Sequence, residues 1–243
     1  AIADLGIEIY DVFPNLISAP EGILTKRQKE LWVVCIDIWA STTWITVYEE
    51  WTLKYSQIIP IGWDSVTNDV ALWVRTSIDT AERLKLDHGQ INLEKFENYT
   101  DITIDLSKIS AWEDGETSKL YLSKIITARY EEILYFVKDA LKRIWRDWML
   151  PEWAVFVWEA VKMKWFLELS KEILRLPATI WIPCANSVIW DSTLWDPSFT
   201  SVIWSLYLAN KFRNGKSVMS INVKWFYGSI FGSIKKVIKK ILP

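Results

Sequence analysis

The chain has 243 residues, of which 51% are hydrophobic, so it can form one large domain or two small ones with a sizeable core. No apolar run reaches the roughly 18 residues that a membrane-spanning helix needs, and neither a secretory signal nor a metal-ligand cluster is visible. The only histidine, His88, follows Asp87 at a predicted helix end, which disfavours a conventional Ser-His-Asp site. Cys35 and Cys184 lie in apolar runs and are expected to be buried free thiols in a reducing compartment.

The net charge of -2 conceals an uneven distribution along the chain. The last acidic residue is Asp196, and eight lysines and arginines follow it. An acidic body with a basic tail indicates that the tail has an anionic partner, either a membrane or a nucleic acid.

Tryptophan is unusually abundant, with 17 residues against 8 glycines, whereas glycine normally makes up about 7% of a chain. Several tryptophans occupy turn positions at which glycine is usual, such as Trp63, Trp112 and Trp195. We therefore hypothesise that a codon read as glycine in the source organism (UGA, reassigned in some bacteria) appears here as tryptophan. The alternative is a genuinely tryptophan-rich protein.

After a short strand at 6–12 and a polar helical turn at 25–30, an apolar run ends in Asp37, and a hydroxyl-rich turn leads into a second β-branched run. This pattern predicts a strand, a tight turn and a strand. Small turn residues let backbone N–H groups approach phosphate oxygens, and the hydroxyl groups of the turn can add donors. Asp37 could hold a hydrated Mg²⁺ ion, because this cation takes oxygen ligands and keeps several waters. The alternative is an ordinary β-hairpin with a polar turn.

The next three predicted elements are a strand at 53–61 and helices at 64–74 and 77–87. Asp64 and Ser65 offer an N-cap for the first of these helices. On the second helix, Glu82 and Lys85 share a face because they are three residues apart. They form either a solvated salt bridge or a carboxylate and an ammonium that bind the two hydroxyl groups of a ribose.

The region 90–122 is polar and rich in turns, with alternating runs at 101–106 and 119–122 that predict a small inserted β subdomain. Apolar residues at helical spacing then predict a long helix from 123 to about 148.

A buried strand at 154–157 leads through a turn into a helix at 166–174. This arrangement can place a nucleotide against a helix N-terminus. A strand at 178–183 and a helix at 197–212 follow, and the alternation of strands with helices makes the fold class α/β.

The end of the chain carries apolar residues at helical spacing, with lysines on the other face. The residues expected to meet a membrane are Ile230, Phe231, Ile234, Lys235, Lys236, Val237, Ile238, Lys239, Lys240, Ile241 and Leu242. A short basic amphipathic helix of this kind lies in a membrane interface. The alternative is a terminal helix docked on its own domain. Nucleic acid is disfavoured, because the apolar face is wide and no base-stacking platform accompanies it.

Taken together and in order, these segments resemble the FtsA family of bacterial cell-division proteins, which are actin-like ATP-binding proteins that tether the division ring to the membrane. Residues 37–43 resemble a family phosphate loop, Asp-Ile-Gly-Gly-Gly-Thr-Thr, with Trp39 and Trp44 where the family has glycine. Residues 62–71 are similar to the family motif Gly-Gly-x-x-x-Thr-x-Asp-Ile-Ala, and residues 150–160 resemble its adenosine motif. The other matching segments are 81–85, 129–133 and the basic tail.

The resemblance implies an actin-like ATPase fold of the ribonuclease-H type, with ATP and Mg²⁺ as ligands. The nucleotide-binding residues that it implies are Asp37, Trp39, Ala40, Ser41, Thr42, Thr43, Gly62, Glu82, Lys85, Trp158, Glu159 and Ala160, with Asp37 also at the metal. Indole rings at Trp39, Trp44 and Trp158 would occupy the space of phosphates and adenine, so the chain as written is expected to bind ATP poorly or not at all. No strong base is apparent, and any ATPase activity is expected to be weak or incidental.

The same resemblance implies an actin-like nucleotide-binding subdomain at 1–89 and 150–212, a small inserted α+β subdomain with the long helix at 90–149, a linker at 213–227 and a membrane-targeting amphipathic helix at 228–243. The family's first half is missing, so the chain is expected to be a fragment.

The partners implied are the C-terminal tail of the tubulin-like protein FtsZ, with Arg129 as a contact, anionic lipids, and other copies in the full-length protein, but not nucleic acid. The location implied is the inner face of the cell membrane at the division site. A pilus-assembly ATPase and a small-molecule kinase of the same superfamily are the alternatives.

Overall fold

The computed structural model describes residues 6, 16, 19, 20, 23–96, 101–144, 153–157 and 159–181. The chain divides into two compact units, residues 1–205 and 206–243, and every described residue belongs to the first. Most of the predicted strand at 6–12, the helix at 197–212, the linker and the amphipathic helix lie outside the described residues.

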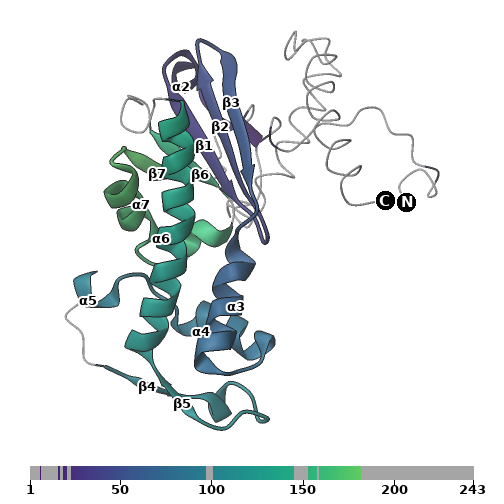
Figure 1. Ribbon diagram of the computed structural model, residues 1–243, viewed down its shortest axis with the longest axis vertical. Helices are drawn as coiled ribbons and strands as arrows, with labels where there is room; N and C mark the ends of the chain where they lie inside the picture. Colours follow the sequence, from purple (N-terminus) through teal and green to yellow (C-terminus); the bar gives the residue numbers. More distant parts are fainter. Residues whose placement is uncertain are drawn as a thin grey trace, which may run out of the picture. The chain divides into compact units, whose positions relative to one another are not determined.

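A mixed five-stranded sheet forms the centre of the described part of the chain (Figure 1). Its strands are β1 (Val33–Ile38), β2 (Thr43–Glu49), β3 (Thr52–Ile59), β6 (Ala154–Val157) and β7 (Ala178–Ile180). The spatial order is β3-β2-β1-β6-β7, in which β1 to β3 form an antiparallel meander and β6 and β7 run parallel to β1. The parallel pairs place the carboxyl ends of β1 and β6 at the same edge of the sheet, which is where ligands bind in open α/β sheets.

Both faces of β1 are covered, because every residue of this strand is buried. Val34, Ile36 and Ile38 belong to a large hydrophobic core, whereas Val33 and Cys35 belong to a smaller cluster. Since side chains alternate along a strand, Asp37 shares the face of the smaller cluster. An otherwise apolar strand with a buried carboxylate as its penultimate residue is therefore the sequence signature of this position.

Among the described residues, four helices and two short α-helical turns cover the sheet or extend from it, as Figure 1 shows. They are α3 (Trp63–Val74), α4 (Ile78–His88), α6 (Lys119–Arg143) and α7 (Phe166–Leu174), with α2 (Lys26–Glu30) and α5 (Leu93–Phe96) as the short turns. The long helix α6 packs against α3, α4 and α7. Thr25 begins α2 with a reciprocal capping box to Gln28, which explains why this short polar segment is helical.

Three aromatic rings in edge-to-face contact join α6 to the sheet and to α7. Tyr130 of α6 and Phe156 of β6 both make edge contacts to Phe166, with ring centroids 5.6 and 4.9 Å away. All three side chains are fully buried. The Tyr130 hydroxyl also donates a hydrogen bond to the Ala160 carbonyl at 2.8 Å, so its polar end is satisfied inside the core.

A separate two-stranded sheet of β4 (Thr103–Asp105) and β5 (Glu116–Ser118) is linked by a 3₁₀ turn, η2 (Leu106–Lys108). The strand predicted at 119–122 is wrong: these residues form the first turn of α6, because the Ser118 hydroxyl accepts from the Tyr121 N–H and caps the helix. The long helix therefore begins before 123.

The aromatic cluster allows a test of the fold. Replacing Phe166 by alanine is expected to lower the free energy of unfolding by about 3–5 kcal/mol, because it removes a fully buried ring and leaves a cavity. Phe136→Ala on the exposed face of α6, where the ring is 44% exposed, is the matched control and is expected to change stability by no more than about 0.5 kcal/mol. Urea unfolding measures both, and equal losses would contradict the packing described here.

Candidate functional site

The turn between β1 and β2 is a tight hairpin at the carboxyl edge of the sheet. The Trp39 N–H donates to the Thr42 carbonyl at 2.8 Å, which leaves Ala40 and Ser41 exposed at the tip. The Thr42 hydroxyl accepts from the Trp44 indole N–H at 2.8 Å. The strand, turn and strand predicted from the sequence are therefore confirmed.

Asp37 is the buried acid of this turn. It is only 5% exposed and lies between Trp44 on β2 and Val157 on β6 in the sheet register. Burial raises its pKa to about 7, and the indole of Trp39 partly offsets that rise. Its Oδ1 oxygen is buried and has no protein hydrogen-bond donor. A buried carboxylate oxygen of this kind fits a cation that brings its own waters, as Mg²⁺ does.

The same turn rests on the first residues of α3. The N–H groups of Trp63 and Asp64 donate to the carbonyls of Trp39 and Ala40 at 2.9 and 2.8 Å. Gly62 makes this approach possible, because a Cβ atom at this position would lie 2.1 Å from the Trp39 carbonyl oxygen. Gly62 is the N-cap residue of α3, so the N-cap predicted at Asp64 and Ser65 is two to three residues too late.

The hydroxyl of Thr43, at the end of the turn, donates a hydrogen bond to the Ile61 carbonyl at 2.8 Å and so links the turn to the segment before α3. The residues from Asp37 to Thr43 and Gly62 thus form one connected unit, as a phosphate-binding turn requires. The buried Thr43 hydroxyl is occupied in this unit, whereas Ser41 remains exposed.

Glu82 and Lys85 of α4 are joined to α3 by a compact polar cluster. The Lys85 Nζ atom is 2.6 Å from Glu82 Oε2, and the Thr67 hydroxyl donates to Glu82 and accepts from Lys85, both at 2.5 Å. Lys85 is fully buried and Glu82 is partly exposed. Burial raises the pKa of Glu82, but hydrogen bonds from Lys85 and Thr67 outweigh it and hold the pKa below its ordinary value.

The ring of Trp63 covers this cluster. The Lys85 ammonium lies 3.4 Å from the ring centroid, and the Trp63 indole N–H donates to Glu82 Oε1 at 3.4 Å. Thr67 and Trp63 are thus two members of the cluster that were absent from the predicted site. The motif at 62–71 contains both, so their position in it was the signal that could have found them.

The segment after β6 reaches the same edge of the sheet, because Val157 pairs with Asp37. Ala160 is buried in a short 3₁₀ turn, η3 (Glu159–Lys162). Trp158 and the side chain of Glu159 lie outside the described residues.

Arg129, the predicted partner contact, lies in a bridge between α6 and α3. Its guanidinium donates to both oxygens of Asp69, at 2.6 and 2.8 Å, and also pairs with Glu132 on its own helix. The hydrogen bond to Asp69 raises the pKa of Arg129 above its ordinary value. A partner that uses this guanidinium would have to share it with Asp69.

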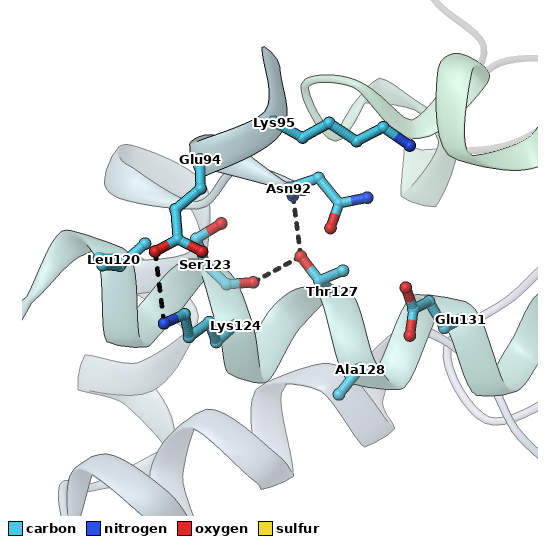
Figure 2. Close-up of a pocket in the computed structure, with 9 residues that line it drawn as sticks. All are labelled: Asn92, Glu94, Lys95, Leu120, Ser123, Lys124, Thr127, Ala128 and Glu131. Carbon is cyan, nitrogen blue, oxygen red and sulfur yellow. Dashed lines mark hydrogen bonds and ion pairs between the residues drawn. The ribbon is translucent and has the colours of Figure 1, made fainter. Parts of the chain in front are cut away.

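A pocket of about 200 Å³ lies between α5 and α6, and none of the predicted nucleotide-binding residues lines it (Figure 2). It is lined by Asn92, Glu94, Lys95, Leu120, Ser123, Lys124, Thr127, Ala128 and Glu131. Its lysines are paired with carboxylates, Lys124 with Glu94 at 3.5 Å and Lys95 with Glu172. The pocket therefore presents little unbalanced charge to a ligand.

The burial of Asp37 predicts how stability depends on pH. An unfolded aspartate has a pKa near 3.8 and the folded one near 7, so between these values only the folded chain holds the proton and stability falls as pH rises. Asp37→Asn cannot ionise, and at pH 8 its free energy of unfolding is expected to exceed that of the parent by roughly 4 kcal/mol.

Chemical denaturation at pH 4 and pH 8 measures this difference between the two chains. Asp139→Asn, which removes an exposed carboxylate paired with Lys142, is the control and is expected to change stability little. The titration of Asp37 would be contradicted if the difference in unfolding free energy between the Asp37 variant and the parent stayed constant from pH 4 to pH 8.

Comparison with known proteins identifies the fold of this site. The MreB5 protein of Spiroplasma citri bound to AMPPNP superposes with a TM-score of 0.64 at 15% identity, over 88% of this chain and 64% of that one. The PilM protein of a PilM-PilN type IV pilus biogenesis complex gives 0.58 at 14% identity, over 81% and 51%. The chain therefore has the actin-like fold.

The family model for the cell division protein FtsA matches residues 34–203. FtsA of Pseudomonas aeruginosa is 29% identical over 178 residues, which are 73% of this chain and 42% of that protein, and FtsA of Bacillus subtilis is 32% identical over 137 residues, 56% and 31%. The chain thus spans less than half the length of these relatives. The match favours cell division over the pilus and kinase alternatives, and the chain belongs to the FtsA family of cell division proteins.

Proposed function

We propose that this chain is the nucleotide-binding part of a cell-division protein that anchors the FtsZ ring to the inner face of the cell membrane. The observation that carries the proposal is the unit of Asp37, the turn at 39–43 and Gly62, in which a buried carboxylate oxygen without a protein donor adjoins a tight turn at the ligand-binding edge of the sheet. ATP and Mg²⁺ are the ligands that suit this unit.

Each part of the unit has a distinct task in the proposed binding of ATP. The exposed tip of the turn offers backbone amides and the Ser41 hydroxyl to phosphate oxygens, which gain most from closely approaching donors. Asp37 holds a water of the Mg²⁺ shell, and the cation lowers the cost of burying the ionised carboxylate. Glu82 and Lys85 provide a carboxylate and an ammonium for the ribose hydroxyls. MreB5 of Spiroplasma citri, which has the same fold, was crystallised both with AMPPNP and with ADP.

The indole of Trp63 opposes this role, because it stacks on the ammonium that the ribose would use. Trp39 and Trp44 add a pair of rings at the turn, with centroids 6.0 Å apart. In the chain as written, the ring of Trp63 therefore covers the Lys85 ammonium, and two further rings lie beside the turn.

Anchoring is proposed to come from the basic amphipathic segment at 228–243, which binds anionic lipids, while Arg129 contributes to the contact with the FtsZ tail. No helix among the described residues is long and apolar enough to cross a membrane. Nucleotide bound between the subdomains would bias the equilibrium between their open and closed arrangements. In this way ATP binding would be coupled to self-association of the full-length protein.

Removing the covering rings tests the nucleotide site. The combined variant Trp39→Gly, Trp44→Gly and Trp63→Gly is expected to bind Mg²⁺-ATP at least tenfold more tightly than the parent, a gain of about 1.4 kcal/mol or more, because it uncovers Lys85 and the turn. Isothermal titration calorimetry measures the ATP affinity of both chains. Adding Asp37→Asn to the triple variant should remove the dependence of this affinity on Mg²⁺.

The matched control replaces two exposed tryptophans outside the site, Trp73→Gly and Trp112→Gly, and is expected to leave ATP affinity unchanged. Because this chain is shorter than its relatives, the same variants should also be compared in the full-length gene product. Equal affinities for the parent and the triple variant in both contexts would contradict the proposed site.

Co-sedimentation with vesicles tests the anchor. The chain is expected to pellet with vesicles that contain anionic phosphatidylglycerol, and a chain truncated after Asn222 is expected to stay in solution, since it lacks the basic amphipathic segment. Pelleting should weaken as salt is added, because the attraction of lysines to the lipid surface is screened.

A variant with Lys235, Lys236, Lys239 and Lys240 changed to glutamine separates charge from apolar insertion. It is expected to pellet less than the parent and to lose the dependence on salt. Equal sedimentation of the full and truncated chains would mean that the segment is not the anchor.

A further inference from the structure

The described tryptophans occupy positions that are typical of glycine. Ten of the 17 are described: Trp32, Trp39, Trp44, Trp51, Trp63, Trp73, Trp112, Trp153, Trp165 and Trp181. Each lies in a connection between elements or among the first or last two residues of a helix or strand. Glycine marks such boundaries because it adopts the backbone conformations that end regular structure.

Two of these tryptophans have left-handed backbones. Trp51 has φ 63° and follows Glu50 with φ 45°, in the two-residue connection between β2 and β3. A hairpin with two consecutive positive φ angles matches a type I′ turn, whose second central residue is most often glycine. Trp165, the N-cap residue of α7, has φ 69°. A bulky residue in this region is a rare outlier, because its Cβ atom crowds the backbone.

The burial of the aromatic residues points the same way. None of the ten described tryptophans is buried, and Trp112 is 96% exposed, whereas Tyr48, Tyr130, Phe156 and Phe166 are fully buried. The large indole normally contributes most when it is packed. In the described part of the chain the core is built from other aromatic residues, and tryptophan is left at the turns.

We propose that the polypeptide made in the source cell carries glycine where this sequence has tryptophan, through a UGA codon that the cell reads as glycine, and that Trp63 marks the glycine position that governs ligand access to Lys85 and Glu82. The substitution accounts at once for the excess of tryptophan over glycine, for the left-handed backbones and for the exposed rings. It also explains the contact between the Trp63 ring and the Lys85 ammonium. With glycine at position 63, the space of the indole would be open to a ligand.

The first test reads the residue directly. The coding sequence should contain UGA at the tryptophan positions, and mass spectrometry of the protein from the source cell should find glycine in the peptides that span residues 51, 63 and 165. UGG codons, or peptides that contain tryptophan, would overturn the proposal. The result does not depend on ATP binding: a glycine chain that fails to bind nucleotide would refute the proposed function and leave the residue assignment intact.

The second test measures the effect on thermal stability of glycine at the two left-handed positions. Trp51→Gly and Trp165→Gly are each expected to raise the melting temperature by a few degrees, and more than Trp51→Ala and Trp165→Ala, because only glycine adopts a positive φ without strain. Phe136→Gly, inside α6, is the control and is expected to lower the melting temperature. If the glycine variants melt no higher than the alanine variants, the left-handed positions do not require glycine and the proposal fails.

Discussion

The contact between Gly62 and the turn at 39–42 is the constraint on which the rest of the site depends. Two backbone segments touch here with no room for a side chain, and the amides of Trp63 and Asp64 are consumed by the carbonyls of the turn. The N-terminus of α3 therefore holds the turn, and these two amides are not available to an anion. In the proposed site, a phosphate would instead be bound by the amides and hydroxyls of the turn, which α3 keeps in place.

This arrangement also explains how the fold retains a buried acid at its centre. Asp37 is the penultimate residue of the otherwise apolar strand β1, and the hydrogen-bond donors that would normally compensate a buried carboxylate oxygen are missing at Oδ1. Such a group destabilises the ionised chain, so its retention at the ligand-binding edge of the sheet fits a functional demand better than a structural one. The proposed cation site would use both features, because it needs a fixed turn and a carboxylate oxygen that has no protein donor.

Much of this fold follows from the sequence where local signals are strong. The β-branched runs around Asp37 and the polar segment at 25–30 predicted their elements, because the signal and the structure are both local. The N-cap of α3 was misplaced because the choice of Gly62 depends on a contact with residue 39, far away in the chain. The start of α6 was missed because alternation at 119–122 imitates a strand, while the deciding feature is the single hydroxyl of Ser118.

The polar cluster at Glu82 shows why a site is harder to predict than an element. The spacing of Glu82 and Lys85 predicted their proximity, but it could not separate a structural salt bridge from a ribose clamp, and in the folded chain Thr67 and Trp63 complete a bridge between α3 and α4. The two roles are not exclusive. If residue 63 is glycine, Lys85 loses the ring that covers it, and a bound ribose then replaces the indole as the partner of the buried ammonium. Ligand binding would in that case stabilise the packing of α3 on α4, and through the turn that α3 supports it would stabilise the phosphate end of the same site.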